Sequence, residues 1–315
     1  SAVPAAQSFV GPTTIISGQE FLKQVSKNPC FLSITGEFAL TLRGMAAHNA
    51  NSSQLALKQT FLDLYNKSGA GNVLGVSAYS DKDKNTDAVA SPAFSLLGES
   101  NPEEFYTLLD ESMISQGLLP RFTIVEYHGQ RVPLNEAHIQ ALPTFSLIEQ
   151  FAGLAANCHT LMHNGKVINV SCTPDAAAFI KELDEFADLQ INKADSNVTR
   201  ELWNRAHIRT LKLAALIAVG CNFFEPTITL ETAQWAKSLV VHNIWNLLRR
   251  FDRGEVGKDN DESRQVAEVW RMVRHFTNGA FSDVASYGVP QHLYDARIIP
   301  SAYLQRGLMV GQPFR

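Results

Sequence analysis

The segment from Ala93 to Tyr127 constrains the fold more than any other part of this chain. It begins with an apolar run, turns at a polar corner, and continues with an acidic amphipathic pattern typical of a helix. The corner combines Asn101, which can cap a helix, with Pro102, which suits the first helical position. A second apolar run, Phe122–Tyr127, predicts another strand. A strand that ends in polar side chains at a helix N-terminus is where α/β proteins usually place ligands.

The chain before this segment alternates helices with strands. Ser17 and Glu20 form a capping-box pattern at the start of one helix, and the run Cys30–Thr35 predicts a short buried strand. Gly36 and Glu37 follow at the carboxyl end of that strand. The expected order up to residue 135 is helix, strand, helices, strand, strand, helix and strand. This alternation predicts an α/β fold, with helices packed around a sheet.

After Tyr127 the strand patterns become sparse and helical patterns dominate. Apolar residues recur at helical spacing from Phe145 to Met162, and Thr173-Pro174-Asp175 is a strong helix start. A short strand is expected at Lys166–Val170, and three further helices at 176–191, 197–220 and 229–251. The predicted regions are an N-terminal arm (1–16), an α/β core (17–135), a helical domain (136–253), a polar linker (254–263) and a terminal domain (264–315).

The terminal domain has the pattern of a helix-turn-helix unit, in a plain or winged form, because three short helices are separated by turns. Its arginines outnumber its acidic residues by three, which makes it weakly basic. The residues predicted to contact DNA are Arg297, Tyr303, Gln305 and Arg306. Since helix-turn-helix units also pack against proteins, a protein partner is an alternative to DNA.

Composition limits the functions open to the chain. Hydrophobic residues make up 45% of its 315 residues, which is ordinary for a folded protein, and a net charge of −4 confines any DNA contact to a local surface. No apolar run approaches the ~18 residues of a membrane span, and no signal-peptide pattern occurs. We therefore expect a cytoplasmic protein with no membrane partner. The four cysteines form no C-x-x-C pair, which argues against a zinc site or a disulfide framework.

Two predicted strand ends carry residues suited to nucleotide chemistry. Glu37 follows the strand Cys30–Thr35, and RecA-like ATPases present a carboxylate to Mg²⁺ or to the attacking water at such a position. Ser100 and Asn101 follow a later strand, where their side chains can sense a phosphate or position water. Helix capping is the alternative role for Asn101, and short strands that end in Glu are common.

Basic residues provide two further candidates. Arg121 precedes the predicted strand Phe122–Tyr127 and can act as an arginine finger, which neutralises charge on a transferring phosphoryl group; a surface salt bridge is the alternative. Arg205 and Arg209 lie at helical spacing, and we assign them to contact with the cofactor. They belong to a basic stripe that comprises Arg200, Arg205, Arg209 and Lys212. A solvated helix face is the alternative explanation of this stripe.

In combination, these motifs resemble a known family. FLSITGE, SPAFSLLGESNPEEFY, GLLPRF, and RTLKLAALIAV followed by ITLETAQWAKSLV look like the carboxyl-terminal two-thirds of the phage and prophage primase-helicase ATPases, often catalogued as a DUF3987 domain. The resemblance covers about residues 17–250. It implies a partial RecA-like core of the P-loop NTPase type, with ATP and Mg²⁺ as cofactors. It also implies DNA as a partner and a homo-oligomeric ring such as a hexamer.

The same resemblance implies roles for single residues. Glu37 matches the acidic Walker B position that holds the metal, and Asn101 with Ser100 matches the polar sensor at a strand end. Arg121 matches the arginine finger, which acts on the nucleotide of a neighbouring subunit. The family pattern tends to have Asp-Glu at the Walker B position, whereas here Gly36 precedes Glu37.

The sequence contains no phosphate-binding loop. No G-x-x-x-x-G-K-[ST] motif occurs, and the glycine-rich turn Lys67–Asn72 lacks a following Lys-Ser or Lys-Thr pair. We therefore expect either a degenerate family member or a fragment of a longer protein, which the start at Ser1 favours, and no ATP turnover by this chain alone. The predicted function is the carboxyl-terminal part of an ATP-dependent DNA helicase or primase-helicase of mobile-element replication. The alternative is a non-catalytic ATPase-like scaffold or a DNA- or protein-binding module.

Overall fold

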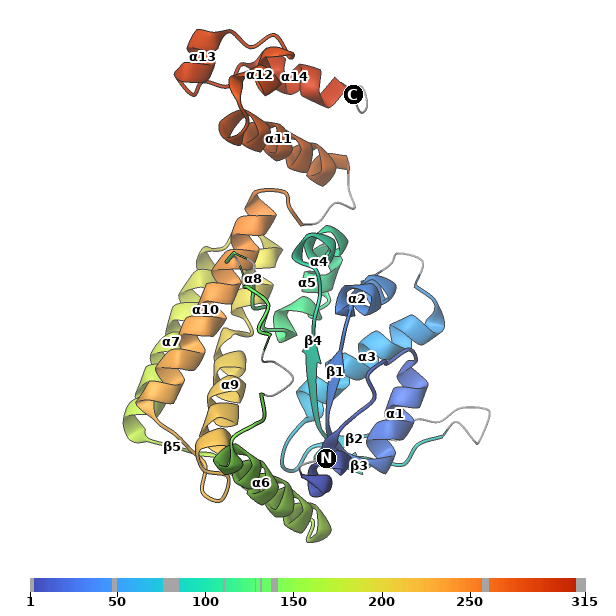
Figure 1. The fold of residues 1–315 in the computed structure, drawn as a ribbon. Coiled ribbons are helices and arrows are strands. Elements are labelled where there is room, and N and C mark those ends of the chain that lie inside the picture. The colour runs from blue at the N-terminus through green and yellow to red at the C-terminus, as the bar shows by residue number, and fades with distance from the viewer. Residues whose placement is uncertain are drawn as a thin grey trace. The chain divides into compact units, whose positions relative to one another are not determined.

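A computed structural model of the chain describes residues 3–46, 50–75, 85–109, 111–127, 129–130, 132–136, 141–256 and 261–309 (Figure 1). The chain divides into two compact units. The first contains Ser1–Pro102 with Ser112–Trp245, and the second contains Glu103–Glu111 with Asn246–Arg315. Helices combine with small sheets, two of them parallel, which confirms the predicted α/β class.

The longest strands of the first unit are β1 (Cys30–Thr35) and β4 (Ala93–Gly98), which pair in parallel. Cys30 lies opposite Ala93 and Thr35 lies opposite Gly98, so both strands end at the same edge of the sheet. On the other side of β1, the backbone N–H of Gly11 donates to the carbonyl of Leu32 at 2.8 Å. Within the described part of the chain, β1 is the partner strand of β4 and the far edge of β4 is open.

The two faces of this sheet differ in burial. Along β1, Phe31 and Ser33 are buried, whereas Leu32 and Ile34 are 40% and 52% exposed. On β4, Leu97 is 55% exposed. One face therefore packs on a core, and the other presents apolar side chains at its surface.

Four phenylalanines fill the buried face of the sheet. Phe21 of α1 (Gly18–Lys27) and Phe61 of α3 (Ser52–Lys67) meet Phe31 and Phe94, with ring centroids 4.8 to 6.2 Å apart. Both helices start at side-chain caps, and α1 starts at Ser17 as predicted. The helix predicted from Ser17 thus forms and packs its aromatic side chain against the predicted strand.

Shorter elements connect these parts of the first unit. They are η1 (Pro4–Phe9), α2 (Phe38–Ala46), the antiparallel pair β2 (Val73–Leu74) and β3 (Val89–Ala90), and η3 (Leu119–Arg121). The division between the units falls after the first residue of α4 (Pro102–Leu108) and after the first residue of α5 (Glu111–Ser115).

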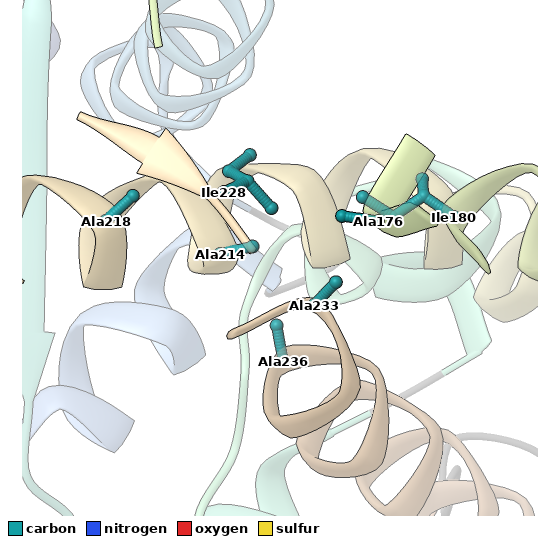
Figure 2. Packing of buried hydrophobic residues seen from close by; sticks show 7 residues of the cluster. All are labelled: Ala176, Ile180, Ala214, Ala218, Ile228, Ala233 and Ala236. Carbon is teal, nitrogen blue, oxygen red and sulfur yellow. The ribbon is translucent and has the colours of Figure 1, made fainter. Parts of the chain in front are cut away.

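Small residues let the long helices of the first unit approach closely. α7 (Pro174–Lys193), α9 (Ala206–Cys221) and α10 (Leu230–Asp252) contribute most of one core cluster, beside the parallel pair of β5 (Ser171–Cys172) and β6 (Thr227–Ile228). Figure 2 shows how its members point toward one another: Ala176, Ile180, Ala214, Ala218, Ile228, Ala233 and Ala236. Because alanine extends only one methyl group from the backbone, the helix axes can lie close together.

The predicted helices of this region correspond to observed ones, with one correction. The patterns at 145–162, 176–191 and 229–251 match α6 (Phe145–His163), α7 and α10. The single helix predicted at 197–220 is wrong, because the structure has α8 (Asn197–Trp203) and α9, separated at Asn204 and Arg205. Arg205 has a φ of −107° and a ψ of 1°, which is not helical, so the helix is interrupted there.

Two predicted strands are also corrected. The pattern Phe122–Tyr127 forms no strand; Asn243 Nδ2 of α10 instead donates to the carbonyl of Ile124 at 3.2 Å, which gives that acceptor a side-chain partner. The strand expected at Lys166–Val170 is replaced by the two-residue β5 that follows it. A strand needs a neighbouring backbone to pair with, and the alternation of side chains does not show whether one is present.

The helices of the second unit surround an aromatic core. They include α11 (Asp261–Asn278), α12 (Phe281–Ala285), α13 (Gln291–Asp295) and α14 (Ser301–Met309). The buried core residues are Met272, Phe276, Val284, Val289 and Tyr303. This region is helical as predicted, with one helix more than the three expected. A wing after the last helix would fall at residues 310–315, outside the described residues.

No helix within the described ranges is both long and apolar enough to cross a membrane.

Candidate functional site

The parallel pairing of β1 and β4 brings together residues that lie far apart in the sequence. Beyond the strands, Glu99 N donates to the carbonyl of Thr35 at 3.0 Å, and Phe38 N donates to the carbonyl of Glu99 at 2.8 Å. Glu37 and Ser100 therefore lie at the same edge of the sheet. Two of the predicted site residues are thus neighbours in the structure.

Glu37 occupies an unusual backbone conformation at this edge. Its φ is +51°, in the left-handed region that side-chain-bearing residues seldom adopt, and its side chain is exposed. The turn lets α2 begin immediately after β1. A non-glycine residue in this region costs on the order of 1 kcal/mol, and such residues often occur at functional sites. Ser91 and Arg297 have similar φ values, so at Glu37 this conformation marks a tight turn and does not by itself assign a role.

Ser100 has a structural role at the same edge. Its Oγ accepts a hydrogen bond from the backbone N–H of Ala39 at 2.8 Å, in the first turn of α2. This bond satisfies one of the donors that a helix start leaves without a partner. Asn101 is exposed and immediately precedes α4. Of the two predicted sensor residues, Ser100 therefore caps α2, and Asn101 is exposed.

Arg121 is held by several neighbours within the first unit. Its Nη1 donates to the carbonyl of Gly117, and its Nη2 donates to Asn66 Oδ1 at 3.1 Å. Its guanidinium carbon lies 5.3 Å from the centre of the Tyr65 ring. Gly117 has a φ of +77°, and a Cβ at that position would collide with Arg121 Nη1. The guanidinium is therefore fixed in place and does not extend freely into solvent.

Adjacent residues connect the Arg121 segment to the strand end. The rings of Phe38 and Phe122 have centroids 5.5 Å apart. Phe38 follows Glu37, and Phe122 follows Arg121. Glu37 and Arg121 of one chain thus belong to segments in contact, whereas the arginine finger was predicted to act on the nucleotide of a neighbouring subunit.

Arg209 is buried, whereas a solvated helix face would leave its side chain exposed. Only 3% of its surface is exposed, and its Nη2 donates to Asn243 Oδ1 and, at 3.4 Å, to Thr123 Oγ1. The reason is that residues of the 122–124 segment and of α10 cover this side of α9. Burial lowers the pKa of Arg209 to about 10, although nearby Tyr65 acts in the opposite direction. The side chain therefore stays positively charged at neutral pH.

Lys212 and Tyr65 join the arginines. Lys212 Nζ lies 3.7 Å from the centre of the Tyr65 ring and donates to the Tyr65 carbonyl at 2.8 Å and to Ser68 Oγ at 3.2 Å. Burial lowers the pKa of Lys212, and the charge of Arg121 lowers it further. Burial raises the pKa of the Tyr65 hydroxyl, while Arg209, Arg121 and Arg205 oppose that rise. We call Arg121, Arg205, Arg209, Lys212 and Tyr65 the basic cluster.

The basic cluster includes a residue that the sequence did not single out. Tyr65 lies in an amphipathic helix and shows only as one of its apolar positions. Lys212 belonged to the basic stripe but was not assigned to a site. The periodic pattern of α9 reveals that basic residues share a helix face, but nothing in it indicates that α3 supplies an aromatic ring to that face.

The residues predicted to contact DNA have different positions in the second unit. Tyr303 is 1% exposed; its hydroxyl donates to the Met272 carbonyl at 3.3 Å and hydrogen-bonds His275 Nδ1 at 2.7 Å. Tyr303 is therefore a core residue, and its predicted DNA contact is withdrawn. Arg297, Gln305 and Arg306 are exposed. The two arginines also donate to backbone carbonyls, those of Thr277 and Tyr287, each at 2.8 Å.

A metal would have to rely on few protein ligands. Among the described residues, no group of three or more His, Cys, Asp or Glu side chains could hold a metal ion. Mg²⁺ commonly uses one or two carboxylates together with phosphate oxygens and water. The exposed carboxylate of Glu37 fits that chemistry only if a polyphosphate supplies the other ligands.

Comparison with known proteins assigns no family. No protein-family model, curated protein or solved structure matches this chain. The likeness to primase-helicase ATPases therefore depends on the sequence motifs and stays a proposal.

Proposed function

We propose that this chain is the carboxyl-terminal part of an ATP-dependent DNA helicase or primase-helicase of mobile-element replication, in which subunits of a homo-oligomeric ring share each ATP site. The observation that carries the proposal is the parallel register of β1 and β4, which brings Glu37 and Ser100 to one strand end. Ligands of open α/β sheets bind outside the carboxyl ends of the strands. A carboxylate at that edge suits the activation of water for attack on a phosphate.

Each predicted residue has a role in this proposal. Glu37 would orient and polarise the attacking water and contribute a ligand to Mg²⁺, while Asn101 would sense the terminal phosphate. Arg121 would stabilise charge on the transferring group, and Arg205 and Arg209 would bind the phosphates. Bound Mg²⁺ would supply charge neutralisation between the phosphate oxygens.

The open sheet supports the view that another segment completes the site. Parallel sheets are normally covered on both faces, whereas Leu32, Ile34 and Leu97 are exposed on one face of this pair. The far edge of β4 is also open within the described residues. A further strand, with the phosphate-binding loop that this sequence lacks, would fit beside β4.

ATP hydrolysis by the full-length protein tests the proposal. Glu37→Gln should reduce turnover by about 100-fold or more and leave ATP binding intact, since general-base catalysis contributes roughly 10²–10⁴. Arg121→Ala should reduce turnover by about 10³ or more. Glu99→Gln, which removes the neighbouring exposed carboxylate, is the matched control. Full turnover in Glu37→Gln would refute the proposal.

A second candidate is a non-catalytic scaffold that binds DNA or protein. The observation that favours it is the absence of a G-x-x-x-x-G-K-[ST] loop from the sequence. Exposed Arg297 and Arg306 in the second unit could contact phosphates of DNA. Salt-dependent DNA binding without any ATP turnover by the full-length protein would favour this candidate. Replacing both arginines with Gln should then reduce the salt dependence.

A further inference from the structure

Buried donors of the basic cluster lack hydrogen-bond acceptors. Arg209 is 3% exposed, yet its Nε and Nη1 have no acceptor among the described residues. The Nε atoms of Arg121 and Arg205 and the hydroxyl of Tyr65 are likewise buried without a partner in that part of the chain. Native proteins satisfy nearly all buried polar atoms, and a group left over calls for an explanation such as a bound water, a bound ion or a catalytic role. Five donor atoms in one place are therefore unusual.

Direct ion pairs do not neutralise this cluster within the described part of the chain. The ion pairs found between described residues include none of its four cations. Burial lowers the pKa of Arg121, and Arg205 lowers it further; Tyr65 and the carboxylate of Glu201 act in the opposite direction. Like charges packed at this density repel one another and need an anion to become favourable.

We propose that the basic cluster binds a terminal phosphate group, such as orthophosphate or the end phosphoryl group of a nucleotide. A dianion would balance much of the positive charge, and its three free oxygens would accept from the guanidinium groups and the Tyr65 hydroxyl. Arginine matches phosphate well because its planar fork can donate two parallel hydrogen bonds. The inference rests on the proposed function, which assigns Arg205 and Arg209 to phosphate binding, and it adds Arg121, Lys212 and Tyr65 of the same chain as ligands of the terminal group.

Burial favours a terminal phosphate over the backbone of a nucleic acid. A phosphodiester carries one negative charge and is esterified on both sides, so it is best bound in an open groove. Arg209 lies too deep for such a strand, since its exposure is only 3%. A terminal group has one attachment and can reach inward while the rest of the ligand stays outside.

Thermal unfolding of the full 315-residue chain with inorganic triphosphate, and separately with orthophosphate, tests this site. Both anions should raise the melting temperature of the wild type, because a ligand that binds the folded state stabilises it. Arg205→Gln should weaken the affinity about tenfold, as should Lys212→Gln. Arg200→Gln removes one charge from an exposed position of α8 and should leave the affinity unchanged.

A second measurement separates ligand binding from a structural role. Without anion, Arg205→Gln should melt at the same or a higher temperature than the wild type, because one repelling charge is gone. A role in stability alone would give a lower melting temperature and no change in affinity, which would overturn the proposal. So would an absence of any shift with either anion in the wild type.

Two further outcomes define the ligand and the link to catalysis. An oligothymidine that competes as strongly as triphosphate, at equal phosphate concentration, would overturn the assignment to a terminal phosphate. Phosphate binding here without ATP turnover by the full-length protein would refute the ATPase and leave this site standing. ATP turnover without phosphate binding at the basic cluster would refute this site and leave the proposed ATPase standing.

Discussion

Tyr303 joins the helices of the second unit through a single hydroxyl. That group contacts both His275 Nδ1 and the carbonyl of Met272, and the ring is buried. Tyr303→Phe should lower the free energy of unfolding by about 1 kcal/mol in urea, because the acceptor loses its donor while the shape is kept. Gln305→Ala, at an exposed neighbour on α14, should change it by less than ~0.5 kcal/mol. Weaker DNA binding by Tyr303→Phe at unchanged stability would restore Tyr303 as a DNA contact.

Arg209 should give the first unit a distinctive alkaline pH dependence. Burial holds its pKa in the fold at about 10, well below the ordinary value for arginine, so between the two values the unfolded chain binds more protons. The cost of burying the charge is therefore complete below pH 10 and declines as pH rises through 10. Relative to Arg209→Met, the wild type should gain roughly 1 kcal/mol of stability from pH 10 to about pH 11.

Denaturant unfolding of both proteins at several pH values measures this gain. Arg200→Met is the matched control for the loss of one arginine. A constant difference between wild type and Arg209→Met across this range would show that Arg209 has no lowered pKa.

At the scale of elements, α2 depends on a side chain from a distant segment. Ser100 Oγ accepts from Ala39 N, so Ser100→Ala should lower the free energy of unfolding by about 1 kcal/mol. Ser100→Thr keeps the oxygen and should retain most of that stability, and Ser95→Ala on the exposed face of β4 is the control. If Ser100→Ala instead left stability intact and lowered ATP turnover, Ser100 would act as a sensor and not as a cap.

Sequence patterns predicted the elements whose determinants are local. Ser17 and Thr173-Pro174 mark helix starts that the structure confirms, and the strand Cys30–Thr35 has the predicted bounds. The strand at Phe122–Tyr127 was wrong because no described backbone pairs with this segment; Asn243 instead donates a hydrogen bond to the carbonyl of Ile124. Pairing depends on which backbone lies alongside, and that is a property of the tertiary structure.

The candidate site was predictable to a similar extent. Glu37 and Ser100 follow strands, and parallel pairing brings strand ends together, so their proximity could be expected from the sequence. The burial of Arg209 could not be expected from the sequence, because the pattern of basic residues along a helix is the same whether solvent or another segment covers that face. Tyr65 entered the cluster only through tertiary packing with α9.

For the molecule as a whole, the exposed face of β1 and β4 allows a test of whether a further segment covers this sheet in the full-length protein. In this chain Ile34→Thr should change the free energy of unfolding by less than ~0.5 kcal/mol, since the side chain is 52% exposed. Phe31→Ala, on the buried face, should cost about 3–5 kcal/mol. In the full-length protein a further segment packed over this face would cover Ile34, and Ile34→Thr should then cost about 1 kcal/mol or more. An equally small effect in both proteins would show that no segment covers this face.

The collision that any side chain at position 117 would make with Arg121 has an evolutionary consequence. A mutation from Gly117 would strain a φ of +77° whatever the space and would require the end of the Arg121 side chain to shift, so glycine should be retained wherever this turn is kept. Gly-x-x-x-Arg after an acidic helix is thus a five-residue search pattern for distant relatives that hold an arginine in this way. Tyr or Phe at the position of Tyr65 would be the companion residue to look for.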